Sequence, residues 1–315
     1  MSALFRQLVL AGASHSAAVA IVKNSSIFEP LVKRFVAGDS LADALSVTAE
    51  LNSRGIAAAL DFLGENTTSA EGAESATREA LAALDGIHQR KLAAYLSVKL
   101  TQLGMDLGEH LTLDNARLLL DSACAGGHFV RIDMEGSSYT ARTIELFTAL
   151  RARYPCVGIV IQSCLYRSES DVRRLVALGA SIRLVKGAYA EPPHIAFRRK
   201  RDTDRNYMRL TEYLLHYGMA PAIATHDERI IEASKAAAKR LGVSNADFEF
   251  QMLYGVRRDL QERLAADGYR VRVYLPFGSQ WYPYLMRRLA ERPANLAFIA
   301  SSLMRERQMS AGRNR

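Results

Sequence analysis

Two cations stand at the end of an apolar run in residues 181–192, SIRLVKGAYAEP. Apolar and polar residues alternate along this run with the period of two that is typical of a β-strand, and the run closes on a glycine and a proline pair. Because an unpaired buried charge is costly, Arg183 and Lys186 should meet carboxylates of the protein or an anionic or electron-rich ligand. This stretch alone leaves both alternatives open.

Polar residues also follow the other apolar runs of the chain. A single polar residue at a strand end is often a helix cap, and Asp227 is well placed for that role. Helix caps do not account for so many polar strand ends, so the pattern favours an enzyme. In chain order these positions are Gly64 with Glu65, Lys99, Asp133 with Glu135, Gln162, Thr225 with His226 and Asp227, Leu253 with Tyr254 and Gly255, and Tyr274 with Gly278.

The strands and helices that would position these residues alternate along the chain. This alternation predicts an α/β fold, a (β/α)8 barrel of the TIM type, whose active face lies at the carboxyl ends of the strands. The competitor is an open doubly wound sheet, which is weakened by the count of eight strands and by the absence of a GxGxxG turn after any of them. The strand candidates are residues 57–65, 92–100, 128–136, 156–163, 181–189, 220–227, 248–255 and 271–278, and the helical stretches between them include 139–152, 168–178, 203–216, 227–241 and 256–267.

The barrel is predicted to occupy most of the 315 residues. Residues 1–55 show helical spacing without a strand pattern, which predicts an N-terminal helical segment that covers the barrel or mediates self-association. Residues 56–303 are predicted to form the catalytic barrel, with a final helix over the active face. Residues 304–315 are predicted to form a basic tail.

Composition indicates an ordinary globular protein. Hydrophobic residues make up 49% of the chain and charged residues 23%, and no apolar run approaches the roughly 20 residues of a membrane span. The formal net charge of +8 permits attraction to nucleic acid or to an anionic membrane surface. Apart from residues 198–201 and the tail, however, lysines and arginines are scattered, and neither group has the interleaved aromatic residues of a base-stacking surface. We therefore expect a solvated surface and no nucleic-acid partner.

Cysteine and histidine usage argues against a disulfide framework and against a metal site. Cys124, Cys156 and Cys164 form no CxxC pair and stand among apolar neighbours, which predicts reduced packing residues of a cytoplasmic protein. The seven histidines are scattered, and only His226 falls on the predicted active face. A metal is therefore not expected.

The cations at the strand ends allow two kinds of chemistry. Lys99 or Lys186 could form the Schiff base of a lyase or aldolase, or hold pyridoxal phosphate. A site for a charged cofactor and a carboxylate is favoured instead, because Arg287 and Arg288 follow the eighth strand in the segment SQWYPYLMRRLAER. Adjacent arginines on a helix point about 100° apart and can flank one small anion through their planar guanidinium groups. A noncatalytic basic binding module is the third hypothesis.

Six segments carry a family resemblance: LSVKLTQLG, RIDMEGSSYT, RLVKGAYAEP, ATHDERI, FEFQMLYGVR and RVYLPFGSQWYPYLMRRLAER. Together they resemble the proline dehydrogenase family in its short monofunctional bacterial form, over residues 65–295. The last segment, with its paired arginines, is the most specific. The resemblance implies a distorted barrel that holds FAD noncovalently, oxidises L-proline to Δ1-pyrroline-5-carboxylate and passes electrons to a membrane quinone.

The resemblance also implies roles for residues on the substrate side. Lys99, Arg287 and Arg288 match the positions that hold the proline carboxylate. Asp133 resembles an electrostatic partner linked to Lys99. Arg183 resembles the arginine at the reactive edge of the flavin, where it can stabilise the reduced, anionic form.

The remaining roles are implied in the same way. The flavin and phosphate contacts would be Met134, Gln162, Lys186, Gly187 and Ala188, with Thr225 and His226 toward the ribose and adenine. The walls around the pyrrolidine ring would be Leu253, Tyr274 and Tyr284, and Glu65 would be a gate carboxylate that pairs with Arg287 when the site closes.

The resemblance extends to partners and location. The chain is too short for the aldehyde dehydrogenase half of bifunctional relatives, so a separate pyrroline-5-carboxylate dehydrogenase is expected to consume the product. We expect a cytoplasmic protein that associates peripherally with the inner face of the cell membrane, where it would meet the quinone.

Overall fold

The computed structural model describes residues 29–291, and side chains within residues 32–286. Eight parallel strands form a closed barrel in chain order, with the eighth strand hydrogen-bonded to the first. The predicted (β/α)8 fold and all eight predicted strands are therefore confirmed. The strands are β1 Ala57–Phe62, β2 Ala94–Val98, β3 Val130–Ile132, β4 Val157–Gln162, β5 Ser181–Val185, β6 Ala222–Ala224, β7 Glu249–Leu253 and β8 Arg270–Phe277.

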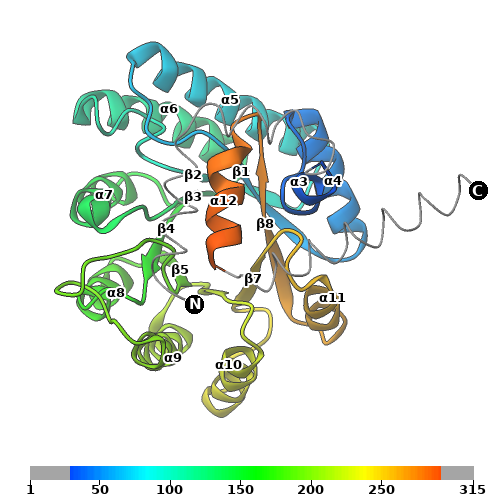
Figure 1. Ribbon diagram of the computed structural model, residues 1–315, viewed down its shortest axis with the longest axis vertical. Helices are drawn as coiled ribbons and strands as arrows, with labels where there is room; N and C mark the ends of the chain where they lie inside the picture. Colours follow the sequence, from blue (N-terminus) through cyan, green and yellow to red (C-terminus); the bar gives the residue numbers. More distant parts are fainter. Residues whose placement is uncertain (1–28, 292–315) are drawn as a thin grey trace, which may run out of the picture.

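Helices form a ring around the barrel (Figure 1). Local signals set several of their ends, and Asp227 caps α10 as predicted, because Arg229 N–H donates to its Oδ1 atom at 3.2 Å. Ser40 and Asp43 form a reciprocal capping box at the start of α4. The helices are α3 Glu29–Phe35, α4 Leu41–Ser53, α5 Ala70–Gln89, α6 Glu109–Ala125, α7 Ser137–Arg151, α8 Ser168–Ala177, α9 Lys200–Tyr217, α10 Glu228–Leu241, α11 Arg258–Ala266 and α12 Trp281–Glu291.

The helix after the eighth strand does not join the ring. Helix α12 lies across the barrel mouth, as the sequence predicts, and its Tyr284 lines the central cavity (Figure 1). The outer position beside β8 and β1 is filled instead by α4, which packs against both strands. Helix α3 packs against α12 in a small apolar cluster that includes Phe35, Trp281 and Leu285. Helices from the N-terminal segment thus complete the ring and support the helix over the active face, whereas residues 1–28 and 304–315 lie outside the described residues.

The interior of the barrel is polar over much of its length. Barrels of this kind are usually filled by Val, Ile and Leu side chains. Here Arg183 of β5 donates hydrogen bonds to Ser97 Oγ of β2 at 2.7 Å and to Gln251 Oε1 of β7 at 3.1 Å, so three strands that are not neighbours meet across the lumen. The residues that alternate with these, such as Ile182 and Phe250, belong to the apolar core that the strands share with the helices.

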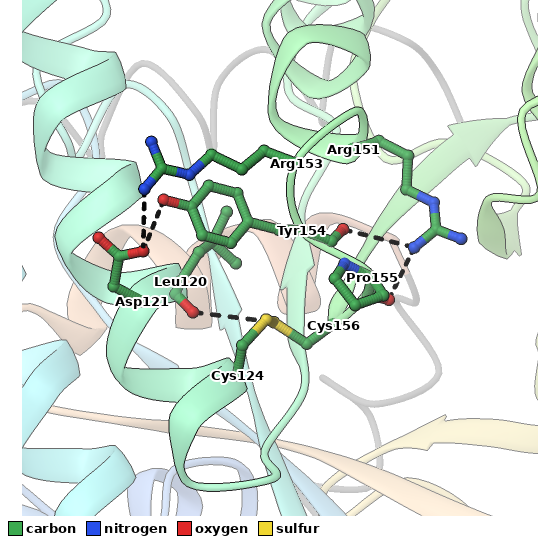
Figure 2. Close-up of a disulfide and its surroundings, with 8 residues drawn as sticks. All are labelled: Leu120, Asp121, Cys124, Arg151, Arg153, Tyr154, Pro155 and Cys156. Atoms are coloured by element: carbon green, nitrogen blue, oxygen red, sulfur yellow. Dashed lines mark hydrogen bonds and ion pairs between the residues drawn. A yellow bond between two sulfur atoms is a disulfide. The ribbon is translucent and has the colours of Figure 1, made fainter.

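Two of the cysteines differ from the prediction. Cys124, in the last turn of α6, and Cys156, which precedes β4, form a disulfide (Figure 2). Their sequence separation is 32 residues, but the packing of α6 beside β4 brings their Cα atoms to 5.6 Å, a distance that a disulfide can span. The expectation that all three cysteines are reduced is therefore wrong for this pair. Among the described residues, Cys164 is the free cysteine.

Candidate functional site

The carboxyl ends of the strands surround a cavity of about 480 Å³. Arg287 and Arg288 lie on α12, but their side chains are outside the described part of the structure, and so is the predicted pairing of Arg287 with Glu65. All other site residues predicted from the sequence line this one cavity: Glu65, Lys99, Asp133, Met134, Gln162, Arg183, Lys186, Gly187, Ala188, Thr225, His226, Leu253, Tyr274 and Tyr284.

Lys99 is the centre of a buried charge cluster. It follows β2 and is only 7% exposed. Its Nζ atom donates a hydrogen bond to Asp61 Oδ1 at 2.8 Å, and lies 3.6 Å from Asp133 Oδ2 and 3.8 Å from Glu65 Oε1. Burial alone would lower the pKa of Lys99, but the charges of Asp61, Asp133 and Glu65 outweigh it and raise the pKa. Lys99 is therefore a charged ammonium group at neutral pH.

Asp133 joins this cluster to Arg183. Its Oδ1 atom is ion-paired with Arg183 Nη2 and accepts a hydrogen bond from Ser97 Oγ at 2.7 Å, while its Oδ2 atom accepts one from Tyr274 OH at 2.7 Å. Burial would raise the pKa of Asp133, but the charges of Arg183 and Lys99 more than offset burial, so the pKa is lowered. The group is therefore a carboxylate that holds two cations and one phenol in fixed positions.

One buried nitrogen atom of the Arg183 guanidinium has no partner in the described part of the structure. Its Nη1 and Nη2 atoms bind Gln251, Ser97 and Asp133, whereas its Nε atom has no hydrogen-bond partner among the described residues, although it is buried. Buried donors are nearly always paired, and Arg183 lines the cavity. A ligand with an acceptor atom would satisfy this N–H group.

A second charge cluster lies along the same cavity. Lys186 Nζ is 2.6 Å from Asp204 Oδ1 and 3.2 Å from Asp227 Oδ2, and Lys200 pairs with the same two carboxylates. Arg183 and Lys186 thus both meet carboxylates of the protein, and both also line the cavity. The first alternative drawn from their strand, carboxylate partners within the protein, is confirmed, and a ligand at these two cations stays a prediction.

Gly187, next to Lys186, packs closely against Cys164. Its φ angle is +111°, and a Cβ atom there would collide with Cys164 Sγ. Only glycine adopts this conformation without strain. Nearby, Gln162 Nε2 donates to the backbone oxygen of Glu135 at 2.8 Å, and His226 Nε2 accepts from Leu253 N–H at 2.8 Å. These bonds hold two of the predicted cofactor contacts in place.

Asp61 is a site residue that the sequence patterns did not predict; it is 1% exposed and forms the shortest contact of Lys99. Its Oδ2 atom has no hydrogen-bond partner among the described residues. Burial raises the pKa of Asp61, and the Lys99 charge opposes this. The signal was a lone charge inside the apolar strand 57–62, AAALDF. Gln251 was missed as well, because nothing in its local sequence indicates that it meets Arg183.

Glu135 approaches the cluster from the segment after β3 and is 4% exposed. Thr101 donates to it twice, from Oγ1 to Oε1 at 2.6 Å and from N–H to Oε2 at 3.3 Å. Burial raises the pKa of Glu135 from 4.5 to about 7, against the opposing effects of the Thr101 hydrogen bonds and the Lys99 charge. Glu135 therefore exchanges a proton near neutral pH.

The chain is similar to known proteins over most of its length. The family model described as proline dehydrogenase matches residues 44–301. Proline dehydrogenase 1 of Bacillus subtilis is 40% identical over 274 residues, which are 87% of this chain and 91% of the relative. Proline dehydrogenase of Deinococcus radiodurans is 42% identical over 280 residues, 87% of this chain and 90% of the relative.

The fold is also similar to that of a solved structure. Proline utilization A from Bdellovibrio bacteriovorus, inactivated by N-propargylglycine, superimposes with a TM-score of 0.78 and 27% identity. The match covers 91% of this chain but only 36% of that longer one.

Proposed function

The chain belongs to the proline dehydrogenase family, and on this basis we propose that it oxidises L-proline to Δ1-pyrroline-5-carboxylate with FAD as cofactor and passes the electrons to a membrane quinone. The observation that carries the proposal is the pair of buried cations, Lys99 and Arg183, held by Asp133 at the carboxyl ends of the strands. One cation would serve the substrate carboxylate and the other the cofactor.

The substrate carboxylate would bind at Lys99. This ammonium group is charged and positioned by Asp61, and the backbone of Arg287 and Arg288 lies on α12 over the same mouth. Tyr274 and Leu253 would bury the ring methylenes, each worth about 0.8 kcal/mol on transfer from water. Tyr274 is fixed for this role by its hydrogen bond to Asp133.

The residues of the cavity fit FAD. The buried Nε of Arg183, which has no partner among the described residues, would donate to an acceptor of the flavin ring, and Gly187 lines the same cavity. Lys186 and Lys200 would meet the phosphates, with Thr225 and His226 toward the ribose and adenine. When bound, FAD supplies the hydride acceptor. The chain contributes orientation, because positioning the reacting carbon is most of what a protein can add to hydride transfer.

The charges of the site indicate which groups do not transfer protons. Proline must react as the neutral amine, because the nitrogen lone pair assists departure of the hydride from the neighbouring carbon. The charged Lys99 and the carboxylate Asp133 both keep their protonation states at neutral pH, so they act by electrostatics and not by proton transfer.

The alternative function, a Schiff-base lyase on the same barrel, finds less support. A Schiff base requires a neutral lysine amine. Lys99 is stabilised as the ammonium form by Asp61, and Lys186 is paired with Asp204 and Asp227. Covalent trapping of either lysine by borohydride in the presence of substrate would revive this alternative.

The electron acceptor and the product call for partners outside the chain. None of the described helices could cross a bilayer. We propose peripheral contact with the cytoplasmic face of the cell membrane to reach the quinone, and a separate pyrroline-5-carboxylate dehydrogenase that consumes the product.

The test is anaerobic addition of L-proline to the purified protein while its visible spectrum is recorded. The proposal expects a flavin band that bleaches. A yellow protein whose spectrum does not change when proline is added would refute L-proline as the substrate. A colourless protein that FAD cannot reconstitute would refute FAD as the cofactor.

A further inference from the structure

A line of hydrogen bonds continues from Arg183 into the barrel, toward the amino ends of the strands. Gln251, in the middle of β7, is 2% exposed, and its Oε1 atom accepts from Arg183 Nη1 at 3.1 Å. Its Nε2 atom donates to Tyr95 OH of β2 at 2.7 Å and to Glu249 Oε1. Glu249 in turn accepts from Arg272 Nε of β8 at 2.9 Å.

The partners of Gln251 determine which way its amide points. The Glu249 carboxylate can only accept, so it requires the NH2 end of the amide, and the Arg183 guanidinium can only donate, so it requires the oxygen. A flipped amide would set donor against donor at Arg183 and acceptor against acceptor at Glu249. Both N–H groups are then used by Tyr95 and Glu249, and the oxygen faces Arg183.

We propose that Gln251 is a positioning residue for Arg183, and that Glu249 and Tyr95 hold its amide in the orientation this requires. The inference rests on the proposed function, in which Arg183 acts on the cofactor. Asp133 and Ser97 bind the Nη2 end of the guanidinium, and Gln251 binds its Nη1 end. Two anchored ends fix the plane of a rigid group and therefore the direction of its free Nε–H bond.

Loss of Gln251 leaves the guanidinium held at one end. The guanidinium can then pivot about its contact with Asp133, so its charge and its Nε–H group no longer have a fixed position. Stabilisation of the reduced, anionic flavin by Arg183 should weaken as a result, whereas the carboxylate site around Lys99 keeps all of its contacts.

The experiment compares Gln251→Leu with wild type and with Gln261→Leu. Gln261 is a matched control because it is also a buried glutamine, 3% exposed, that donates to two oxygens, those of Leu253 and Val256. The readouts are the reduction potential of the bound flavin, the split between kcat and KM for proline, and the melting temperature. All three proteins are brought to the same flavin content.

The proposal expects about tenfold weaker stabilisation of the reduced flavin in Gln251→Leu, which lowers the potential of a two-electron couple by about 30 mV. The kcat should fall several-fold while KM stays within about twofold, and Gln261→Leu should lose stability without a change in potential. A Gln251→Leu enzyme that melts earlier but keeps the wild-type potential and kcat would overturn the positioning role.

Tyr95→Phe tests the orientation of the Gln251 amide. This variant also provides the test if Gln251→Leu does not fold. This change removes the hydroxyl but keeps the ring that Arg272 covers, 4.1 Å from its centroid. The potential should fall by less than in Gln251→Leu, and the double variant should match Gln251→Leu alone, because both changes act through one amide. Additive shifts, or no shift in Tyr95→Phe, would overturn the role of the network.

Failure of this inference is distinguishable from failure of the proposed function. Wild-type protein that binds no flavin, or whose flavin proline does not reduce, would overturn the proposed function and this inference with it. Equal potentials in a functional wild type and in Gln251→Leu would overturn only the positioning role.

Discussion

Replacing Glu135 with glutamine should change how the stability of the protein depends on pH. Burial raises the pKa of this carboxyl from 4.5 to about 7. Between these pH values the folded protein keeps a proton that the unfolded chain has already released. The stability contributed by Glu135 is therefore fully present below pH 4.5 and is lost as the pH rises through 7.

The size of the effect follows from the two pKa values. They differ by 7 − 4.5, or about 2.5. At about 1.36 kcal/mol per pKa unit, the wild type loses roughly 3 kcal/mol of unfolding free energy between pH 4.5 and pH 8 through this group. Glu135→Gln has no such loss. Its pH-independent cost should stay below about 1 kcal/mol, because its amide oxygen can accept from Thr101 N–H while its NH2 group donates to Thr101 Oγ1.

The assay is urea denaturation of both proteins at a series of pH values from 5 to 8.5. The unfolding free energy of Glu135→Gln relative to wild type should rise by roughly 2.5 kcal/mol across the series, because part of the wild-type loss falls below pH 5, and most of the rise should fall below pH 7.5. Every other titratable group is present in both proteins, so the contributions of those groups to the difference cancel. Glu79→Gln, an exposed change on α5, controls for the loss of one glutamate. A difference that stays flat within about 0.5 kcal/mol would contradict the raised pKa of Glu135, because it would mean that this carboxyl is ionised throughout.

Three further predictions concern the substrate site and the disulfide. Lys99→Met leaves Asp61 without its cation, which should cost about 3–5 kcal/mol in chemical denaturation and raise KM for proline; a cost below about 1 kcal/mol would contradict the buried ion pair. Cys124→Ser, or reduction of the disulfide with Cys156, should lower the unfolding free energy by about 3–4 kcal/mol for a loop of this length, and a thiol count of three in the untreated folded protein would contradict the bridge. Arg288→Ala should raise KM for proline far more than it lowers flavin content, and an unchanged KM would remove its role at the carboxylate.

Periodicity made the barrel predictable. Apolar runs at a spacing of roughly 25 to 40 residues, each followed by a helical pattern, leave few folds that bury all of the strands. The polar residues after those runs could be assigned to one face for the same reason, since parallel strands end together. For this reason the sequence predicts that Lys99, Asp133, Arg183 and Tyr274 lie near one another, and all four line one cavity.

Contacts across the barrel and between helix and strand were not predictable. Asp61, Gln251 and the partner of Cys124 carry no local signal of what they touch, because each meets a residue far away in the chain. Local sequence shows the periodicity of hydrophobic residues in a strand or helix and the kinds of residue at its ends. It does not report which inward side chain of one strand reaches which side chain across the lumen.

The order of strands and helices, the face on which the chemistry lies and the kinds of charge found there therefore follow from local sequence patterns. The pairing of those charges follows from tertiary contacts: Asp61 binds Lys99 and Gln251 binds Arg183. Tertiary contacts also show that α4, near the start of the described chain, takes the outer position beside β8 and β1. Hydrophobic periodicity is a property along the chain, whereas the pairing of buried charges depends on distances across the barrel, which exist only once the barrel has closed.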